Sequence, residues 1–264
     1  AAENRTTLIY NDWGDHRVGA DILCYMTGYN DPRMEKMFLP NDVGDYVGIR
    51  IGIDVAGKST AMTKYSNLIV ESTTPYLWFN AAEATFLRAE YELRWGSEET
   101  AQALYEDAIR LSFEERGASG ADAYIADAAS RPAAYTDPLG NYSAAAQSTV
   151  TIAWTPGADN FEANLERIIT QKWIAIFPLG VEAWSEHRRT GYPRLLPVVA
   201  DKSGGGVDVA QGARRLPYPV EEYQQNNTNL QAAIQQLNAE QTNGNRTGDQ
   251  MGTRVWWDCK PYNN

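Results

Sequence analysis

The sequence predicts a mainly α-helical protein with long irregular loops. Apolar residues recur at alternating three- and four-residue steps after Pro75 and again after Asn160, which is the period of a helix with one buried face. Residues 1–75 and 117–158 lack this period and are rich in small, polar and turn-forming residues. Strands and helices do not alternate regularly along the chain, which argues against a parallel α/β sheet.

The first 75 residues are expected to be irregular. Residues 46–51 and 68–70 are short extended candidates, and Asp31-Pro32 is typical of a turn. We find no helical period over a useful length in this part of the chain. It is therefore predicted to be a loop-rich segment.

The first predicted helix follows Pro75 and ends at Gly96. Glu90 and Arg94 support it from the exposed side, because residues four apart are neighbours on a helix surface. The residues expected on its apolar face are Phe79, Ala82, Phe86, Ala89 and Leu93.

A second helix begins directly afterwards. Ser97 is a good N-cap, and Glu98 and Glu99 suit the positive end of a helix dipole. One tight turn makes the two helices an antiparallel hairpin, and the spacing on the second is similar to a tetratricopeptide unit. One such unit is visible, so a full repeat array is not demonstrated. The residues expected to point inward are Ala101, Leu104, Tyr105, Ala108 and Ile109.

Further helices are predicted in the second half of the chain, separated by loops. Pro178 stops the most apolar of them, and Gly191 closes the next. Residues 201–206 form a flexible turn, and residues 238–264 are polar and loop-like. The predicted helices cover residues 121–128, 160–176 and 181–189, a short helix that begins at Pro219, and residues 229–237.

Charge and composition exclude one class of partner. Hydrophobic residues make up 43% of the 264 residues and charged residues 22%, as in ordinary globular proteins with a sizeable core. The 23 basic and 34 acidic residues give a net charge of -11, and no cluster of Lys and Arg is present. Nucleic-acid binding requires clustered cations against the phosphates, so we expect no DNA or RNA partner.

Residues 52–59 match the G-x-x-x-x-G-K-S pattern of a phosphate-binding loop, with Lys58 and Ser59 as the phosphate and magnesium contacts. Residues 47–51 could be the preceding strand, but residues 60–67 make a poor helix. The alternating strands and helices that carry such a loop are also missing. We interpret the motif as a surface turn.

Catalytic motifs are weak in this sequence. The two histidines, His16 and His187, lie in no zinc or nucleophile motif, and His187 is near a predicted helix C-terminus that favours a cation. A carboxylate pair of the glycosidase type is not singled out, although Asp and Glu are plentiful. We predict no catalytic residue, no metal site and no cofactor.

Aromatic residues divide into two groups. Phe79, Tyr105 and Trp173 fall on apolar helical faces and are expected in the core. The aromatic residues of the N-terminal segment lie among Asp, Asn, Arg and Gly, a mixture that offers both stacking planes and hydrogen bonds to a sugar. Aromatic residues that cover a core edge explain the same pattern equally well. The predicted ligand contacts are Tyr10, Trp13, His16, Arg17 and Tyr29.

The two cysteines, Cys24 and Cys259, lie near opposite ends of the chain. Chain ends often lie close together, so a disulfide is possible in an oxidising compartment. Two unrelated buried thiols are the alternative. Sequence alone leaves the pairing open.

Several strings resemble the SusD/RagB superfamily of outer-membrane nutrient-binding lipoproteins. The longest runs from Gln171-Lys172-Trp173 to Arg188-Arg189-Thr190-Gly191-Tyr192-Pro193. The resemblance covers essentially the whole chain in order, although family members are considerably longer and these motifs belong to their C-terminal portion. The other matching strings are Asp31-Pro32-Arg33, residues 79–90, Arg215-Leu216-Pro217-Tyr218-Pro219 with Glu222 and Asn226, and Val255-Trp256-Trp257-Asp258.

This resemblance implies a SusD-like α-α superhelix with tetratricopeptide-like helices. It implies a single SusD-like domain over residues 1–264, divided into a ligand-side segment (1–75) and a helical segment (76–264). The implied function is non-enzymatic binding of an oligosaccharide or other nutrient at the outer-membrane surface, with delivery to a SusC-like TonB-dependent transporter. A lipid anchor is expected on the N-terminal region of the longer family members. A carbohydrate-active enzyme and a helical-repeat adaptor for protein partners stay open as alternatives.

Overall fold

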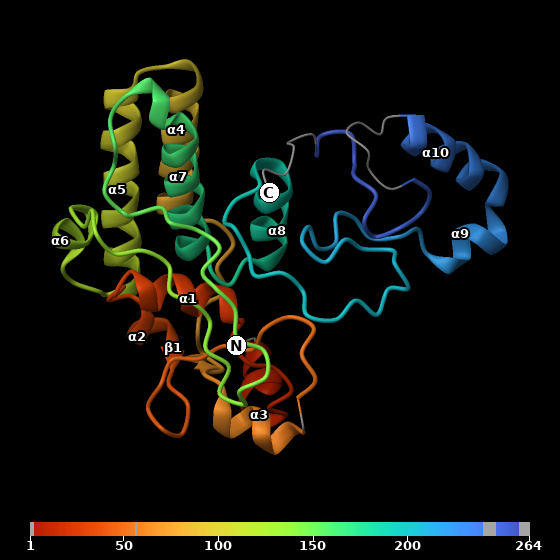
Figure 1. The fold of residues 1–264 in the computed structure, drawn as a ribbon, viewed down its shortest axis with the longest axis horizontal. Helices are drawn as coiled ribbons and strands as arrows, with labels where there is room; N and C mark the ends of the chain where they lie inside the picture. Colours follow the sequence, from red (N-terminus) through yellow and green to blue (C-terminus); the bar gives the residue numbers. More distant parts are fainter. Residues whose placement is uncertain (1–2, 56, 240–246, 259–264) are drawn as a thin grey trace.

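Three helices, α4, α5 and α7, form a bundle to which the other parts of the chain attach (Figure 1). The computed structural model describes residues 3–55, 57–239 and 247–258. The N-terminal segment, with α1, α2, α3 and a small sheet, lies at one end of the bundle (Figure 1). Helix α8 leads away from the bundle to α9 and α10. Within the described ranges, no helix is both long and apolar enough to cross a membrane.

The bundle helices end where the sequence predicts, and α5 also begins there, whereas α4 begins a few residues later than expected. Helix α4 (Ala81–Trp95) is capped by Asn80, whose side chain accepts a hydrogen bond from the Glu83 N–H at 2.7 Å. Helix α5 (Glu98–Arg116) begins after Ser97, as expected, and ends at Gly117 with a φ of 62°. Helix α7 is Phe161–Ala175.

The remaining helices of the second half also agree with the predicted positions to within three residues at each end. They are α6 (Ala121–Ile125), α8 (Gly180–Thr190), α9 (Val220–Gln225) and α10 (Asn227–Ala239). A 3₁₀ turn (Ala158–Asn160), which was not predicted, precedes α7.

The N-terminal segment corrects one expectation, because it contains helices. Helix α1 buries side chains on several sides. Its sequence therefore lacks the separation of an apolar face from a polar face by which an amphipathic helix is recognised. The two strands pair antiparallel, with Phe38 opposite Leu68. The elements are a π-helix (Leu8–Asp12), α1 (Ala20–Gly28), α2 (Met34–Met37), β1 (Phe38–Leu39), α3 (Lys58–Lys64) and β2 (Asn67–Leu68).

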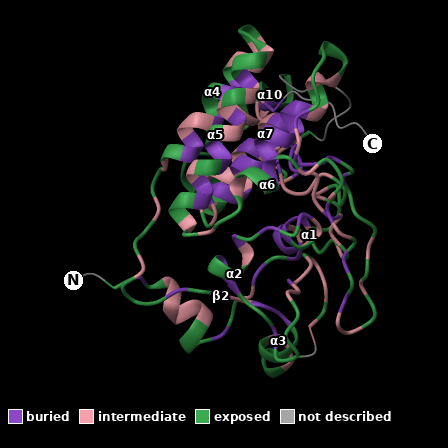
Figure 2. Cartoon of the chain, turned by 90° about the vertical axis from the view of Figure 1, so that its left-hand side faces the viewer, coloured by how far each residue is buried: buried purple, intermediate pink, exposed green. Residues whose placement is uncertain are grey.

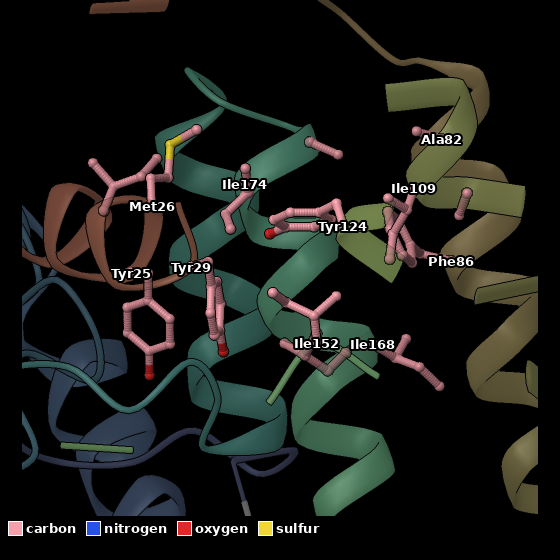
Figure 3. Packing of buried hydrophobic residues seen from close by; sticks show 14 of the residues in the cluster. Tyr25, Met26, Tyr29, Ala82, Phe86, Ile109, Tyr124, Ile152, Ile168 and Ile174 are labelled. Atoms are coloured by element: carbon pink, nitrogen blue, oxygen red, sulfur yellow. The ribbon is translucent and has the colours of Figure 1, made fainter. Parts of the chain in front are cut away.

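One core connects the N-terminal segment to the bundle. In Figure 2, buried residues concentrate where α4, α5 and α7 face one another. Figure 3 shows Met26 of α1 and Tyr29, the residue that follows α1, beside Ile174 of α7, with Phe86 of α4 on the far side of the same cluster. Fully burying a large apolar side chain contributes about 1.5–3 kcal/mol. The division at residue 75 therefore does not separate two cores, and its functional meaning stays a prediction.

A buried guanidinium joins the same two parts. Arg33 is fully buried and pairs with Asp31 at 2.6 Å. It also donates to Ser112 of α5 and to Gln171 of α7, at 2.9 and 2.8 Å. The Asp31-Pro32-Arg33 turn thus places a charge where three elements meet, and each of its hydrogen-bonding groups has a partner.

A second ionic network connects α8 to the bundle. Lys172 of α7 is buried with its Nζ 3.4–3.7 Å from carboxylates of Glu83, Glu182 and Glu186. Arg189 of α8 binds Glu90 of α4 through two hydrogen bonds of 2.7 and 2.6 Å. The longest string that resembles the superfamily, residues 171–193, therefore contributes packing and ion pairing here.

The assignment of Phe79 to the core was wrong. Phe79 precedes the N-cap of α4 and is 61% exposed. The sequence period was extended one turn too far, because the helix begins only at Ala81. Tyr105 is fully buried and Trp173 packs against the core, as predicted.

Candidate functional site

The residues from Tyr10 to Arg17, here called the Trp13 loop, begin within the π-helix (Leu8–Asp12) and continue past its end. The Trp13 N–H donates to the Leu8 carbonyl at 2.7 Å, and the Asp15 N–H donates to the Ile9 carbonyl at 3.0 Å. Gly14 has a φ of 62°, a left-handed conformation that few other residues adopt without strain. These contacts turn the chain sharply and hold the loop in one conformation.

The loop presents an aromatic surface to solvent. Trp13 is 55% exposed, and His16 is also exposed. The His16 ring lies 5.9 Å from the Tyr10 ring, centroid to centroid, at an interplanar angle of 45°. An indole held on a firm loop is suited to stacking against the C–H face of a sugar ring.

The side chains of Tyr10 and Arg17 are half-buried, and they stabilise the loop instead of pointing into solvent. The Arg17 guanidinium donates to the carbonyls of Tyr10 and His16, at 3.3 and 2.6 Å. Tyr10 packs against the core, and burial raises the pKa of its hydroxyl. Burial likewise lowers the pKa of Arg17. The structure thus brings four of the five predicted residues together, two exposed and two half-buried.

The prediction for Tyr29 was wrong. Tyr29 is 2% exposed, and its hydroxyl donates to the Val150 carbonyl at 3.1 Å. Figure 3 shows it in the core, beside Tyr25 and Ile152. Tyr29 is the C-cap residue directly after α1, and its ring lies in the core; this helix was not recognised from the sequence. Tyr29 is therefore a packing residue that a glycan at the surface cannot reach.

Helix α3 lies against the loop and supplies contacts that the sequence did not reveal. The Lys58 Nζ is 2.8 Å from the Asp15 carboxylate, and both side chains are about half exposed. Met62 covers Gly14: a Cβ at that glycine would lie 3.1 Å from the Met62 sulfur. The loop is also anchored by Asn11, whose amide donates to the Val70 carbonyl at 2.9 Å.

The phosphate-loop motif at residues 52–59 is thus used differently. Lys58 is the first residue of α3, a helix that we considered poor, and it pairs with a carboxylate. Ile49 makes one parallel bridge, to Gly19, and the described strands form only the small antiparallel sheet. Ala56, within the motif, lies outside the described residues. This geometry supports the surface interpretation.

His187 differs from its expected charge state. Burial, and then the nearby positive charge of Arg214, lower the pKa of His187 to about 4. Its Nδ1 lies 3.0 Å from the Pro193 carbonyl. Loss of hydration outweighs the helix dipole, so the imidazole is neutral at pH 7. Among the described residues, no group of three or more His, Cys, Asp or Glu is arranged to hold a metal ion.

A separate hollow of about 300 Å³ lies where the end of α7 meets α8. It is lined mainly by apolar groups, including Ile51, Trp184 and Leu195. Sugar hydroxyls need hydrogen-bond partners when they leave water, and this lining offers few. The Trp13 loop combines an exposed ring with polar neighbours and is the better candidate for a glycan.

Cys24 is half-buried, and burial raises the pKa of its thiol to about 12. A thiol of this kind is a poor nucleophile. Its possible partner, Cys259, lies outside the described residues, so the pairing stays a prediction.

Comparison with known proteins gives a consistent result. The family described as "Susd and RagB outer membrane lipoprotein" matches residues 1–258. No curated protein matches. A solved structure of a SusD homologue from Bacteroides thetaiotaomicron is 52% identical, with a TM-score of 0.93; the match covers 99% of this chain and 56% of that one.

Two other solved structures are similar. A SusD homologue from Bacteroides uniformis is 43% identical with a TM-score of 0.88, covering 98% of this chain and 54% of that one. A chitin-binding SusD homologue from Flavobacterium johnsoniae is 42% identical with a TM-score of 0.87, covering 98% and 53%. This chain therefore spans about half the length of the proteins it matches.

Proposed function

This chain belongs to the SusD/RagB family of outer membrane lipoproteins, and we propose that it binds a glycan through the Trp13 loop. The observation that carries the proposal is the half-exposed indole of Trp13, held on a loop that α3 and Arg17 stabilise. Stacking on Trp13 supplies the affinity, and His16 supplies hydrogen bonds to hydroxyls. No covalent step is part of this proposal.

The surroundings of the loop support a binding role over a catalytic one. The Asp15 carboxylate in this loop is paired with Lys58 and lies half exposed at the surface, whereas glycoside hydrolysis uses two carboxyl groups that flank the bond. The alternative of a carbohydrate-active enzyme is tested by incubating the protein with each bound glycan. Release of shorter products will refute the binding role as stated here.

Family membership supports a place at the outer-membrane surface, next to a SusC-like TonB-dependent transporter. We propose that the longer family polypeptide carries the lipid anchor on a part that this chain does not span. The captured glycan then passes to the transporter, which moves it across the membrane. Copurification of the natural protein with a transporter from its own membrane tests this partner.

Calorimetric titration is the direct test of the binding site. Chito-oligosaccharides are the first probe, because a homologue 42% identical to this chain is a chitin binder; a thermal-shift screen of other glycans follows, since a ligand of the folded state raises Tm. We expect Trp13→Ala to weaken binding by about tenfold or more, which corresponds to about 1.4 kcal/mol. His16→Ala is expected to weaken it less.

Trp256→Ala is the matched control. Trp256 is 72% exposed and lies near the other end of the sequence, so its loss is expected to leave affinity unchanged. Equal effects of both tryptophan substitutions will argue against a site at the Trp13 loop. Failure of every tested glycan to bind or to raise Tm will argue against glycan binding by this chain.

A further inference from the structure

Residues 137–142, here called the Tyr142 loop, form a second loop that is firmly held beside α3. The Asp137 carboxylate is buried and accepts hydrogen bonds from the N–H groups of Asn141 and Tyr142, at 2.9 and 3.1 Å. The Tyr142 carbonyl in turn accepts a hydrogen bond from the Arg50 guanidinium at 2.8 Å. The backbone at the tip of this loop is therefore fixed in one conformation before any ligand arrives, which lowers the entropy that binding costs.

Helix α3 holds both the Trp13 loop and the Tyr142 loop. Its residues Lys58 and Met62 contact the Trp13 loop. Tyr65, the residue directly after α3, donates a hydrogen bond from its hydroxyl to the Asp137 carboxylate at 3.2 Å. Lys58 and Tyr65 lie at opposite ends of this short helix, so the two loops contact it roughly 10 Å apart along its axis. Figure 1 shows the green Tyr142 loop reaching down to α3 beside the N-terminal segment.

The tip of the Tyr142 loop carries groups of the kind that bind a sugar. Asn141 is exposed, and its side-chain amide, which can both donate and accept, forms no hydrogen bond within the described ranges. The Tyr142 side chain is partly exposed, and its hydroxyl likewise has no hydrogen-bond partner in the part of the chain that the structure describes. This pairing of an aromatic ring with a polar group repeats that of Trp13 and His16 in the other loop.

The charged groups that hold the two loops are already engaged. Lys58 pairs with Asp15, and the Asp137 carboxylate is satisfied by the donors of its own loop and of Tyr65. The Arg50 guanidinium donates to main-chain carbonyls. Recognition is thus left to uncharged groups, namely aromatic rings, an amide and a hydroxyl. Such groups suit a neutral sugar better than an acidic one.

We propose that the Tyr142 loop is a second contact for the ligand of the Trp13 loop, so that the site takes a neutral oligosaccharide of several sugar units. This inference rests on the proposed function, because it requires a glycan on Trp13. A chain long enough to touch both loops gains the second set of contacts as an intramolecular event. Helix α3 sets the distance between the contacts and thereby the shortest ligand that uses both.

Calorimetric titration with a short and a long ligand tests the proposal. Chitobiose and chitohexaose are the probes, because they differ in length but share the same sugar unit. We expect the unaltered protein to bind chitohexaose at least about tenfold more tightly than chitobiose. Tyr142→Ala is expected to remove most of this difference and to leave the affinity for chitobiose unchanged, whereas Trp13→Ala weakens the binding of both probes.

Tyr91→Ala is the matched control, because Tyr91 is an exposed tyrosine of α4 that belongs to neither loop. It is expected to change neither affinity. An unchanged Tm shows that each variant keeps its fold. If Tyr142→Ala does not fold, Asn141→Ala, which leaves the ring in place, gives the same test with a smaller expected loss.

The outcomes separate this inference from the proposed function. Equal affinity of the unaltered protein for the two probes, or a Tyr142→Ala variant that keeps the full difference between them, will overturn the second contact. The proposed function stands in that case if Trp13→Ala still weakens binding. Absence of chitohexaose binding to the unaltered protein will overturn both the second contact and the proposed function for glycans of the chitin type.

Discussion

The helical bundle and the N-terminal segment are stabilised in different ways. In the bundle, α4, α5 and α7 satisfy their own backbone groups and pack through apolar faces. In the N-terminal segment, asparagine side chains reach main-chain carbonyls distant in sequence. Asn4, Asn11 and Asn41 donate to the carbonyls of Thr74, Val70 and Lys64.

This difference matters for function. A loop held by single side-chain contacts can present residues such as Trp13 in orientations that regular elements do not offer. It also depends on groups far apart in the chain, so it orders only after those groups have met. The bundle thus provides the rigid frame, and the N-terminal segment presents the candidate ligand contacts.

Removing Arg33, whose side chain connects the N-terminal segment to the bundle, is expected to reduce the free energy of unfolding more than any other change proposed here. Arg33→Ala leaves the Asp31 carboxylate buried without its partner, and removes contacts to α5 and α7. We expect the free energy of unfolding to fall by about 3–5 kcal/mol, measured by urea denaturation. Arg110→Ala, which breaks only exposed ion pairs, is the control, with a change within about 0.5 kcal/mol. A similar loss of unfolding free energy in both variants would contradict a role for Arg33 in connecting the two regions.

In the helical region, His187 is expected to make the stability of the protein depend on pH near neutrality. Its pKa is lowered to about 4 in the folded protein, first by burial, whereas the ordinary value is 6.5. The unfolded chain therefore binds a proton that the folded protein excludes, so stability is present above pH 6.5 and is lost as pH falls toward 4.

Between pH 7 and pH 5 this loss is about 2 kcal/mol from His187 alone. His187→Gln removes the titrating group, so the variant is expected to show a smaller decline over the same range. Denaturation curves at pH 7, 6 and 5 measure the difference. Parallel declines in the two proteins would show that other groups govern the acid sensitivity.

Tyr29→Phe sharpens the distinction between core and ligand contact. The substitution removes the hydrogen bond to the Val150 carbonyl, and we expect stability to fall by about 1 kcal/mol. Affinity for any confirmed glycan is expected to stay the same, because the ring is buried. Weaker binding without loss of stability would return Tyr29 to the ligand site.

Loss of the ion pair between Asp15 and Lys58 is expected to change stability the least. Both side chains are half exposed, and exposed pairs contribute about 0.2–1 kcal/mol. A double-mutant cycle with Asp15→Ala and Lys58→Ala will measure the coupling, which is expected to decline in 1 M salt. A coupling energy that salt leaves unchanged would indicate that hydrogen bonding, rather than charge, joins α3 to the loop.

The predictability of each region follows from the range of its interactions. Helices α4, α5, α7 and α8 carry their apolar period and end signals within the sequence, so their positions were predicted well. Helix α1 has no polar face, and its surroundings come from Val150, Ile152 and the bundle, so it was missed. The error for Tyr29 followed directly from that omission.

The candidate site was predicted in part for the same reason. Tyr10, Trp13, His16 and Arg17 lie within eight residues of one another, so chain connectivity already keeps them together. Lys58 and Met62 come from α3, more than forty residues later, and no local pattern links them to the loop. Of these two residues, only Lys58 was singled out in the sequence, and there it belonged to the phosphate-loop pattern of residues 52–59.

The sequence by itself determined the mainly helical class, the bundle helices and the family, because local periodicity and long matching strings are properties of contiguous residues. The tertiary structure decided which aromatic side chains are buried, since burial depends on partners distant in the chain. It placed Tyr29 in the core and left Trp13 exposed, although both were predicted from the same kind of surroundings. It also left Tyr91 and Trp95 uncovered on a helix whose other face is packed, which no sequence pattern had indicated.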